Sequence, residues 1–216
     1  MCSSDLMIRF RHLTLAMLGA LAFAPAAFAQ DASTDSASGK RFAIVGGYAL
    51  SQPTKNPQIG GVRADVDGDG APTLSASYFF NDNFAIEAWG SADKFGQRLN
   101  SNGGKIGSID SQPVALSGQY HFRGADSIVR PFVGLGYYQA NYTGEKLLSG
   151  QRLGVDNAKG GIATAGVDLN INPTWFARAD VRYMQGSKSD VKLDGVKVGE
   201  AELNPVTVGV GIGARF

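Results

Sequence analysis

The chain has 216 residues, of which 20 are basic and 19 acidic, so its formal net charge is only +1. A balance this close to zero gives no electrostatic reason to expect nucleic acid as a partner. With one cysteine and two histidines, the chain has no disulfide framework and no cysteine metal site. It also has few of the cysteine and histidine side chains that often act as catalytic nucleophiles or bases.

The first predicted element, residues 1–29, is a cleavable secretory signal. A basic patch precedes an apolar run over 13–23 that is too short for a transmembrane helix. Residues 27–29 (Ala, Phe, Ala) supply the small-x-small pattern that signal peptidase accepts, which predicts cleavage before Gln30. The single cysteine, Cys2, lies ahead of the apolar run, so it is not the lipid-bearing cysteine of a lipoprotein.

Residues 30–40 follow as a short flexible tether, because they are mostly Ser, Ala, Asp and Gly without apolar periodicity. From residue 41 onward glycine is abundant and the apolar residues alternate with others. No segment approaches the roughly 18 consecutive apolar residues of a membrane helix. We therefore predict that residues 41–216 form one β-domain.

Eight segments of this domain alternate with the period of two of a β-strand. They are roughly 41–50, 73–80, 84–91, 113–122, 128–142, 161–170, 175–184 and 205–216. In the last segment Val206, Val208 and Val210 share one face, whereas Thr207 and Gly209 share the other. Segments of about ten alternating residues suit a transmembrane barrel, in which one face meets lipid and the other a polar interior.

The connections between these segments alternate in length. Those at 81–83, 123–127 and 171–174 are short, whereas those near 51–72, 92–112, 143–160 and 185–204 are long and polar. We call the two ends of the domain the turn end and the loop end. Aromatic residues gather near the turn end, which indicates an interfacial girdle. They are Tyr78, Phe79, Phe80, Phe84, Tyr120, Phe122, Trp175 and Phe176.

The sequence therefore predicts an all-β fold, an eight-stranded antiparallel transmembrane β-barrel of the bacterial outer membrane, with short periplasmic turns and four longer extracellular loops. The alternative is a soluble β-sandwich or lipocalin-like barrel, whose apolar faces would point inward. Phe216, at the close of an amphipathic strand, resembles the signal that the outer-membrane assembly machinery reads, and it argues against the soluble alternatives. Outer-membrane lipid and this machinery are the expected partners.

A polar plug is expected inside the barrel toward the turn end, if the more apolar face of each strand meets lipid. Opposite charges in a confined lumen should pair, because an unpaired buried charge is costly. The predicted plug residues are Glu87, Gln119, His121, Arg130, Asp168, Arg178, Asp180, Arg182 and Arg215. The phase of the fifth strand stays open, since Phe132 and Val133 are both apolar.

Toward the loop end the inward side chains are largely apolar. They are Trp89, Ala115, Tyr138, Tyr142, Ile162 and Met184. An eight-stranded barrel is either filled by side chains or holds one small ligand, and it is too narrow for a water channel. An apolar funnel above a polar plug would admit a small hydrophobic solute and leave it only a lateral exit. Pro113 cannot donate to the strand ladder, so a gap beside it is the predicted exit.

Five motifs in this order resemble the OmpW family of outer-membrane proteins. They lie at 77–87, 105–113, 130–137, 179–183 and 204–216. The resemblance implies a narrow barrel through which small hydrophobic compounds cross passively, entering at the top and leaving sideways through the wall. The chain departs from the family pattern at 93–97 and around Pro113, which both belong to the predicted outer mouth.

Other chemistry is weakly indicated. Residues 65–70 match the first half of a calcium loop, but its twelfth position is Ala76 and Pro72 interrupts it, so we expect no metal and no cofactor. No nucleophile motif accompanies His121, so we expect no enzyme. The alternative function is a structural or surface-interaction barrel acting through its loops. A channel needs the apolar lumen residues to line a cavity, whereas a structural barrel needs them to close it.

Overall fold

The computed structural model describes the backbone of residues 39–54, 58–59, 62–63, 65–101, 104–147, 153–155, 157–186, 189–193, 196–201 and 204–216. The predicted signal peptide and most of the predicted tether lie outside these residues, so both stay predictions. No helix in the described part of the chain is long and apolar enough to cross a membrane.

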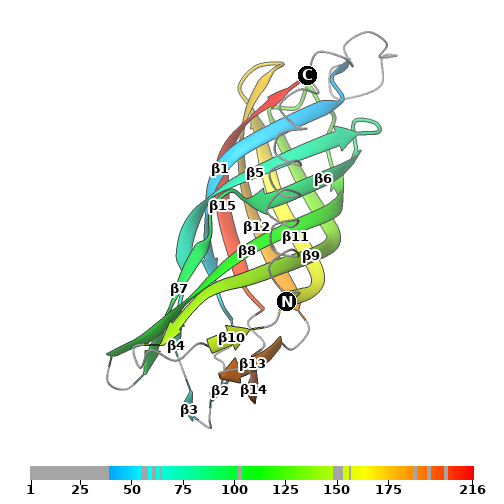
Figure 1. Ribbon diagram of the computed structural model, residues 1–216. Coiled ribbons are helices and arrows are strands. Elements are labelled where there is room, and N and C mark those ends of the chain that lie inside the picture. Colours follow the sequence, from blue (N-terminus) through cyan, green and yellow to red (C-terminus); the bar gives the residue numbers. More distant parts are fainter. Residues whose placement is uncertain are drawn as a thin grey trace, which may run out of the picture.

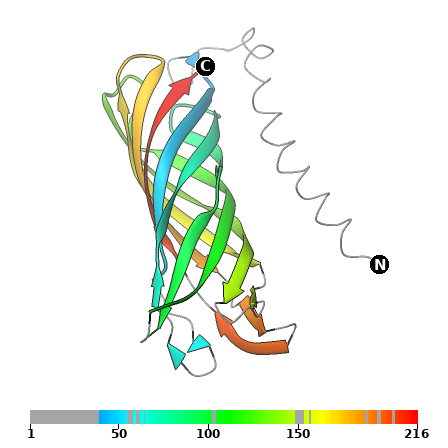
Figure 2. The same ribbon diagram turned by 60° about the vertical axis from the view of Figure 1, so that its left-hand side comes forward.

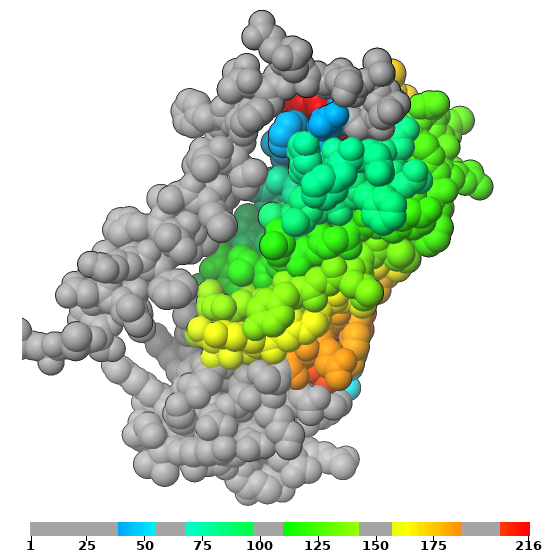
Figure 3. Space-filling view, turned by 90° about the vertical axis from the view of Figure 1, so that its right-hand side faces the viewer, coloured from blue at the N-terminus to red at the C-terminus, as the bar shows by residue number. Residues whose placement is uncertain are grey.

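Eight antiparallel strands close into a barrel (Figure 1). They are β1 (Phe42–Gln52), β5 (Asp69–Phe79), β6 (Phe84–Ser91), β8 (Gly104–His121), β9 (Val129–Leu147), β11 (Ala158–Asn170), β12 (Trp175–Gly186) and β15 (Val206–Arg215). Each strand pairs with the next one along the chain. Figure 3 shows this order on one side of the molecule as oblique bands, from turquoise β5 and β6 through green β8 and β9 to yellow β11 and orange β12.

The barrel closes where β15 pairs with β1, from Ala43–Arg215 to Gln52–Val206. Beyond this ladder the backbones of Phe42 and Phe216 exchange two hydrogen bonds, of 3.1 and 2.8 Å. Closure gives every barrel strand a neighbour on both sides, as a spanning sheet in lipid requires. The side chain of Phe216 is exposed beside this seam, and its role in assembly stays a prediction.

The side chains on the outer surface settle the choice between a membrane barrel and a soluble one. Burial alternates along the strands, and the outward positions carry large apolar side chains such as Leu135, 73% exposed, and Val210, 64% exposed. Many inward positions are small and polar, among them Ser75, Ser77 and Ser117. Exposing so extensive an apolar surface to water is unfavourable, whereas its contact with lipid is favourable. The expected eight-stranded membrane barrel is therefore confirmed.

Seven short strands lie at the loop end, within the connections expected to be long. They are β2 (Gln58–Ile59), β3 (Val62–Arg63), β4 (Asp65–Asp67), β7 (Phe95–Ser101), β10 (Leu153–Val155), β13 (Ser189–Leu193) and β14 (Val196–Ala201). β8 begins at Gly104, earlier than the expected start near 113, and pairs with β9 as far as Gly107–Leu147. The sequence understated this extension because residues 104–112 lack an alternating apolar face. Figure 2 shows the green strands projecting at the loop end.

The aromatic girdle is present, with two corrections. Phe80, Phe84, Tyr120, Phe122 and Trp175 are exposed on the outer surface near the turn end, and Tyr78 lies 5.3 Å from Phe80 between ring centroids. Phe79 and Phe176, also assigned to the girdle, are fully buried instead. Each shares the inward phase of its strand, Phe79 with Ser77 and Phe176 with Arg178.

Candidate functional site

Ion pairs fill the lumen toward the turn end. Arg178 on β12 contacts Glu87 on β6 through Nη1 and Oε2, and Asp168 on β11 through Nε and Oδ1, both at 2.7 Å. Arg182 contacts the other oxygen of Glu87 and also Asp180, both at 2.8 Å. Glu87 therefore joins two arginines across the barrel, between strands that are not neighbours in the sheet. We call these five residues the ion-paired network.

Two further arginines extend this network toward the short turns. Arg215 lies 3.4 Å from Asp168 and donates to the side-chain oxygen of Asn170 at 2.7 Å. Arg130 donates to two backbone carbonyls, that of Arg123 at 3.1 Å and that of Asp82. Both arginines are buried, so carbonyl and amide oxygens supplement the carboxylates that the sequence had indicated. Asn170 was not among the predicted plug residues.

Three buried phenylalanine rings lie against the guanidinium groups of the lumen arginines. Arg130 lies 5.0 Å from the centroid of Phe79, Arg178 4.5 Å from that of Phe132, and Arg215 4.2 Å from that of Phe176. A guanidinium stacks favourably on an aromatic face, so rings can replace part of its lost hydration. Glycines make room for two of these rings, since a Cβ on Gly166 would collide with Phe132 and one on Gly213 with Phe176.

His121 and Gln119 complete the expected plug. His121 is fully buried between Phe79 and Phe132, with ring centroids 5.2 and 5.1 Å away, and Gln119 is also buried. In the described part of the chain no group of three or more His, Cys, Asp or Glu side chains could hold a metal. The second half of the calcium-loop pattern lies in β5, which begins at Asp69.

Toward the loop end an apolar cluster fills the lumen. Its members are Trp89, Ala115, Tyr138, Ala140, Ala158, Ile162 and Met184, with Tyr142 packed against it. We call this set, including Tyr142, the loop-end cluster, and it brings together all six residues that the sequence predicted to face inward toward the loop end. Its seven core members are at most 8% exposed, so the side chains are packed against one another. Their role as a channel lining stays a prediction.

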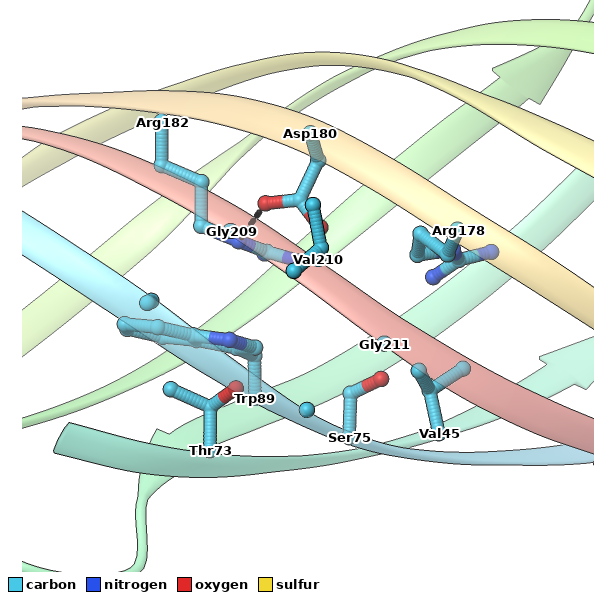
Figure 4. A pocket seen from close by; sticks show the side chains of 12 residues that line it. Val45, Thr73, Ser75, Trp89, Arg178, Asp180, Arg182, Gly209, Val210 and Gly211 are labelled. Atoms are coloured by element: carbon cyan, nitrogen blue, oxygen red, sulfur yellow. Dashed lines mark hydrogen bonds and ion pairs between the residues drawn. The ribbon is translucent and has the colours of Figure 1, made fainter.

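A small cavity lies beside the ion-paired network and the loop-end cluster (Figure 4). Its lining includes Asp180 and Arg182 from the network and Trp89 from the cluster. Trp89 and Arg182 are themselves in contact, with the guanidinium carbon 4.7 Å from the ring centroid. The cavity volume is about 10 Å³, which is space for about one water molecule.

The barrel wall is interrupted where β6 gives way to β7. The ladder between β6 and β8 ends at the pair Gly90–Val114. The ladder between β7 and β8 begins at the pair Phe95–Ser111. Residues 91–94 therefore bulge out of the ladder with β8.

Pro113 lies opposite this bulge. It pairs with Ala140 of β9 on its other side and has no N–H to donate. The side chain of Gln112 donates to the carbonyl oxygen of Ser91 at 3.3 Å, so an amide side chain bridges the interruption. The strand ladder is thus weakened beside Pro113, and its use as an exit stays a prediction.

Phe95, the first residue of β7, turns its ring into the barrel. It is fully buried and packs with Ala49 of β1 and Ala71 of β5. Sequence reasoning missed this residue because it placed Phe95 in a polar outer loop. The available signal was a large aromatic residue in an otherwise polar stretch.

Sequence comparisons identify similar proteins. The model of the OmpW family matches residues 45–216. Outer membrane protein W of Vibrio cholerae serotype O1 is 28% identical over 157 residues, which cover 66% of this chain and 72% of that protein. Outer membrane protein W of Escherichia coli K12 is 25% identical over 181 residues, which cover 80% and 77%.

Solved structures show the same fold. The crystal structure of OprG from Pseudomonas aeruginosa has a TM-score of 0.71 at 22% identity, covering 84% of this chain and 97% of OprG. The outer-membrane protein AlkL in lipid bilayers has a TM-score of 0.63 at 21% identity, covering 87% and 94%. At these identities the likeness establishes the barrel architecture.

Proposed function

Since the chain belongs to the OmpW family and is an integral protein of the bacterial outer membrane, we propose that it is a passive channel for small hydrophobic molecules. These solutes enter the barrel from the loop end, reach its apolar half and leave sideways through the wall. The observation that carries the proposal is an apolar cluster directly against an ion-paired network, at the level where the strand ladder is interrupted.

The ion-paired network would block a straight route through the barrel to the periplasm. A hydrophobic solute passing through it would have to separate Glu87 from Arg178 and Arg182. Separating buried charges without replacing their partners is strongly unfavourable. The network therefore acts as the floor of the apolar compartment.

The interruption beside Pro113 supports a lateral exit, because it lies at the height of the loop-end cluster. Pro113 pairs with Ala140, a member of that cluster. Trp89 and Ala115, both in the cluster, form the pair next to the last rung, Gly90–Val114. A solute inside the cluster is thus adjacent to the weakened part of the wall, where Val114 faces lipid.

The close packing of the loop-end cluster means that passage requires side chains to move. Met184 is unbranched and adaptable, so it is suited to yield to a solute. The ring of Phe95 packs on the inner face of β1 and β5 just beyond the interruption. We infer that Phe95 limits the rate of passage between the lumen and the wall.

Replacing Phe95 with Ala should raise solute uptake severalfold, because the ring that fills the lumen beside the interruption is lost. The measurement is the initial rate at which a small apolar fluorescent compound enters cells with equal amounts of inserted protein, compared with cells lacking it. Phe84→Ala is the matched control, since Phe84 is exposed on the lipid-facing side. Equal rates for the two variants would contradict this role of Phe95.

One observation favours a second function, a structural or surface-interaction barrel. The loop-end cluster is packed, and the cavity beside it has space for about one water molecule. In that case the extension of β7, β8 and β9 at the loop end would present the functional surface. Uptake no faster than in cells without the protein, with the barrel shown to be inserted, would favour this function over the channel.

A further inference from the structure

Glycines create the small cavity between the ion-paired network and the loop-end cluster (Figure 4). Gly47 on β1 and both Gly209 and Gly211 on β15 line it, where other inward positions carry side chains. A space for about one water molecule is too small for a hydrocarbon chain. It is the right size for a single polar group.

Asp180 presents an open carboxylate oxygen to this cavity. Its Oδ1 accepts a hydrogen bond from Nε of Arg182 at 2.8 Å, and its Oδ2 accepts none from any described residue. The side chain of Asp180 is 11% exposed, whereas those of Glu87 and Asp168 are fully buried. Asp180 is therefore the one carboxylate of the network that is accessible to a small molecule.

Ser75 supplies a second polar group. It lines the same cavity and is 4% exposed. A serine hydroxyl both donates and accepts, so it can form a hydrogen bond with a small polar group in the cavity.

The surrounding charges select a neutral group. Arg178 and Arg182 line the cavity together with Asp180, so a cation would meet two guanidinium groups and an anion would meet the carboxylate. A hydroxyl group can donate to Asp180 and accept from Ser75. Trp89 lines both the cavity and the loop-end cluster, so the apolar part of the same molecule would lie against the cluster.

We propose that this cavity binds the hydroxyl group of a small uncharged amphiphile, an alcohol, while its apolar part enters the loop-end cluster as side chains there move apart. The proposal rests on the channel function, whose compartment it shares. It narrows the solute class from purely apolar compounds to those with one neutral hydroxyl group. We call the cavity the hydroxyl site.

Trp89 provides a direct reporter of binding. The chain has two tryptophans, and Trp175 lies 50% exposed on the outer surface, so Trp175→Phe leaves Trp89 as the single fluorophore. This variant, inserted in phospholipid nanodiscs, is titrated with benzyl alcohol and with toluene, which differ by one hydroxyl group. The emission of Trp89 should respond to benzyl alcohol at a roughly tenfold lower concentration, as one hydrogen bond to a charged group implies.

Gly209→Ala tests the site itself. An added Cβ would lie 3.6 and 3.8 Å from the two oxygens of Asp180 and 3.4 Å from Cβ of Ala49, so the methyl group fits while occupying the cavity. The preference for benzyl alcohol should then disappear. Gly46→Ala is the matched control on the outer face of β1, where nothing lies within 4 Å, and it should keep the preference.

The outcomes separate the hydroxyl site from the channel. Equal responses to both solutes, or a preference that survives Gly209→Ala, would overturn the hydroxyl site. If uptake of the apolar fluorescent compound still exceeds that of cells without the protein, the channel function stands. If the unmodified protein does not raise uptake above that of cells without it, the channel function is wrong, and the hydroxyl site loses its basis.

Discussion

Replacing Glu87 with leucine should lower the free energy of unfolding by roughly 3–5 kcal/mol, the cost of removing one partner from a buried ion pair. Glu87 is fully buried and accepts hydrogen bonds from Arg178 at 2.7 Å and Arg182 at 2.8 Å. Without it, each guanidinium keeps only one carboxylate, Asp168 or Asp180. The barrel would then hold buried positive charge that no carboxylate on β6 offsets.

Urea unfolding of the lipid-inserted barrel, followed by tryptophan fluorescence, measures this change. Glu87→Gln keeps the shape of the side chain and one acceptor oxygen, so its loss of stability should be smaller than that of the leucine variant. Asp126→Leu is the matched control at an exposed turn and should change the free energy of unfolding by no more than about 0.5 kcal/mol. A loss below about 1 kcal/mol in Glu87→Leu would show that the network does not hold the barrel together.

Met184→Trp should reduce protein-dependent uptake to the level of cells without the protein. Met184 is buried in the loop-end cluster and pairs with Ile162 of the neighbouring strand. The larger, stiffer indole would fill the space that a solute needs, and it lacks the adaptability of methionine. Overpacking should also cost about 1–3 kcal/mol of stability, which leaves a barrel able to insert.

The control for this variant is Tyr183→Trp. Tyr183 is the preceding residue of β12 and is exposed on the outer surface, so its replacement should leave uptake unchanged. Both variants are compared at equal amounts of inserted protein, with the same apolar fluorescent compound. Unchanged uptake in the Met184→Trp variant would rule out a path through the loop-end cluster. It would favour the alternative function, in which the barrel acts through its loops.

The amino-acid sequence alone determined the class of fold and most strand positions. Alternation is a local property with a period of two, so the third strand was expected at 84–91 and lies at Phe84–Ser91. The alternating long and short connections were equally readable, because polar and apolar runs are local in the chain. Glu87, Arg178 and Met184, which the alternation predicted to face inward, are buried, while the roles of the plug and channel-lining residues stay predictions.

Local pattern did not determine which aromatic residues are inside the barrel. Phe79 and Phe176 lie next to short turns, which suggested the girdle, yet both rings cover guanidinium groups in the lumen. The alternation also left open whether Phe132 faces inward or outward, because the adjacent Val133 is apolar as well. A phenylalanine ring in the polar part of the lumen is stabilised when a guanidinium group from another strand lies over its face, which local sequence does not reveal.

Tertiary structure alone decided the partners and the open space. Glu87 and Arg182 are 95 positions apart on strands that do not pair, so only closure of the barrel brings them together. The same holds for the packing of Phe95 on β1 and β5, and for the cavity that glycines leave beside Asp180. The alternation of a strand depends only on residues that are close in the sequence. Contacts across the lumen depend on the shear and radius of the closed sheet.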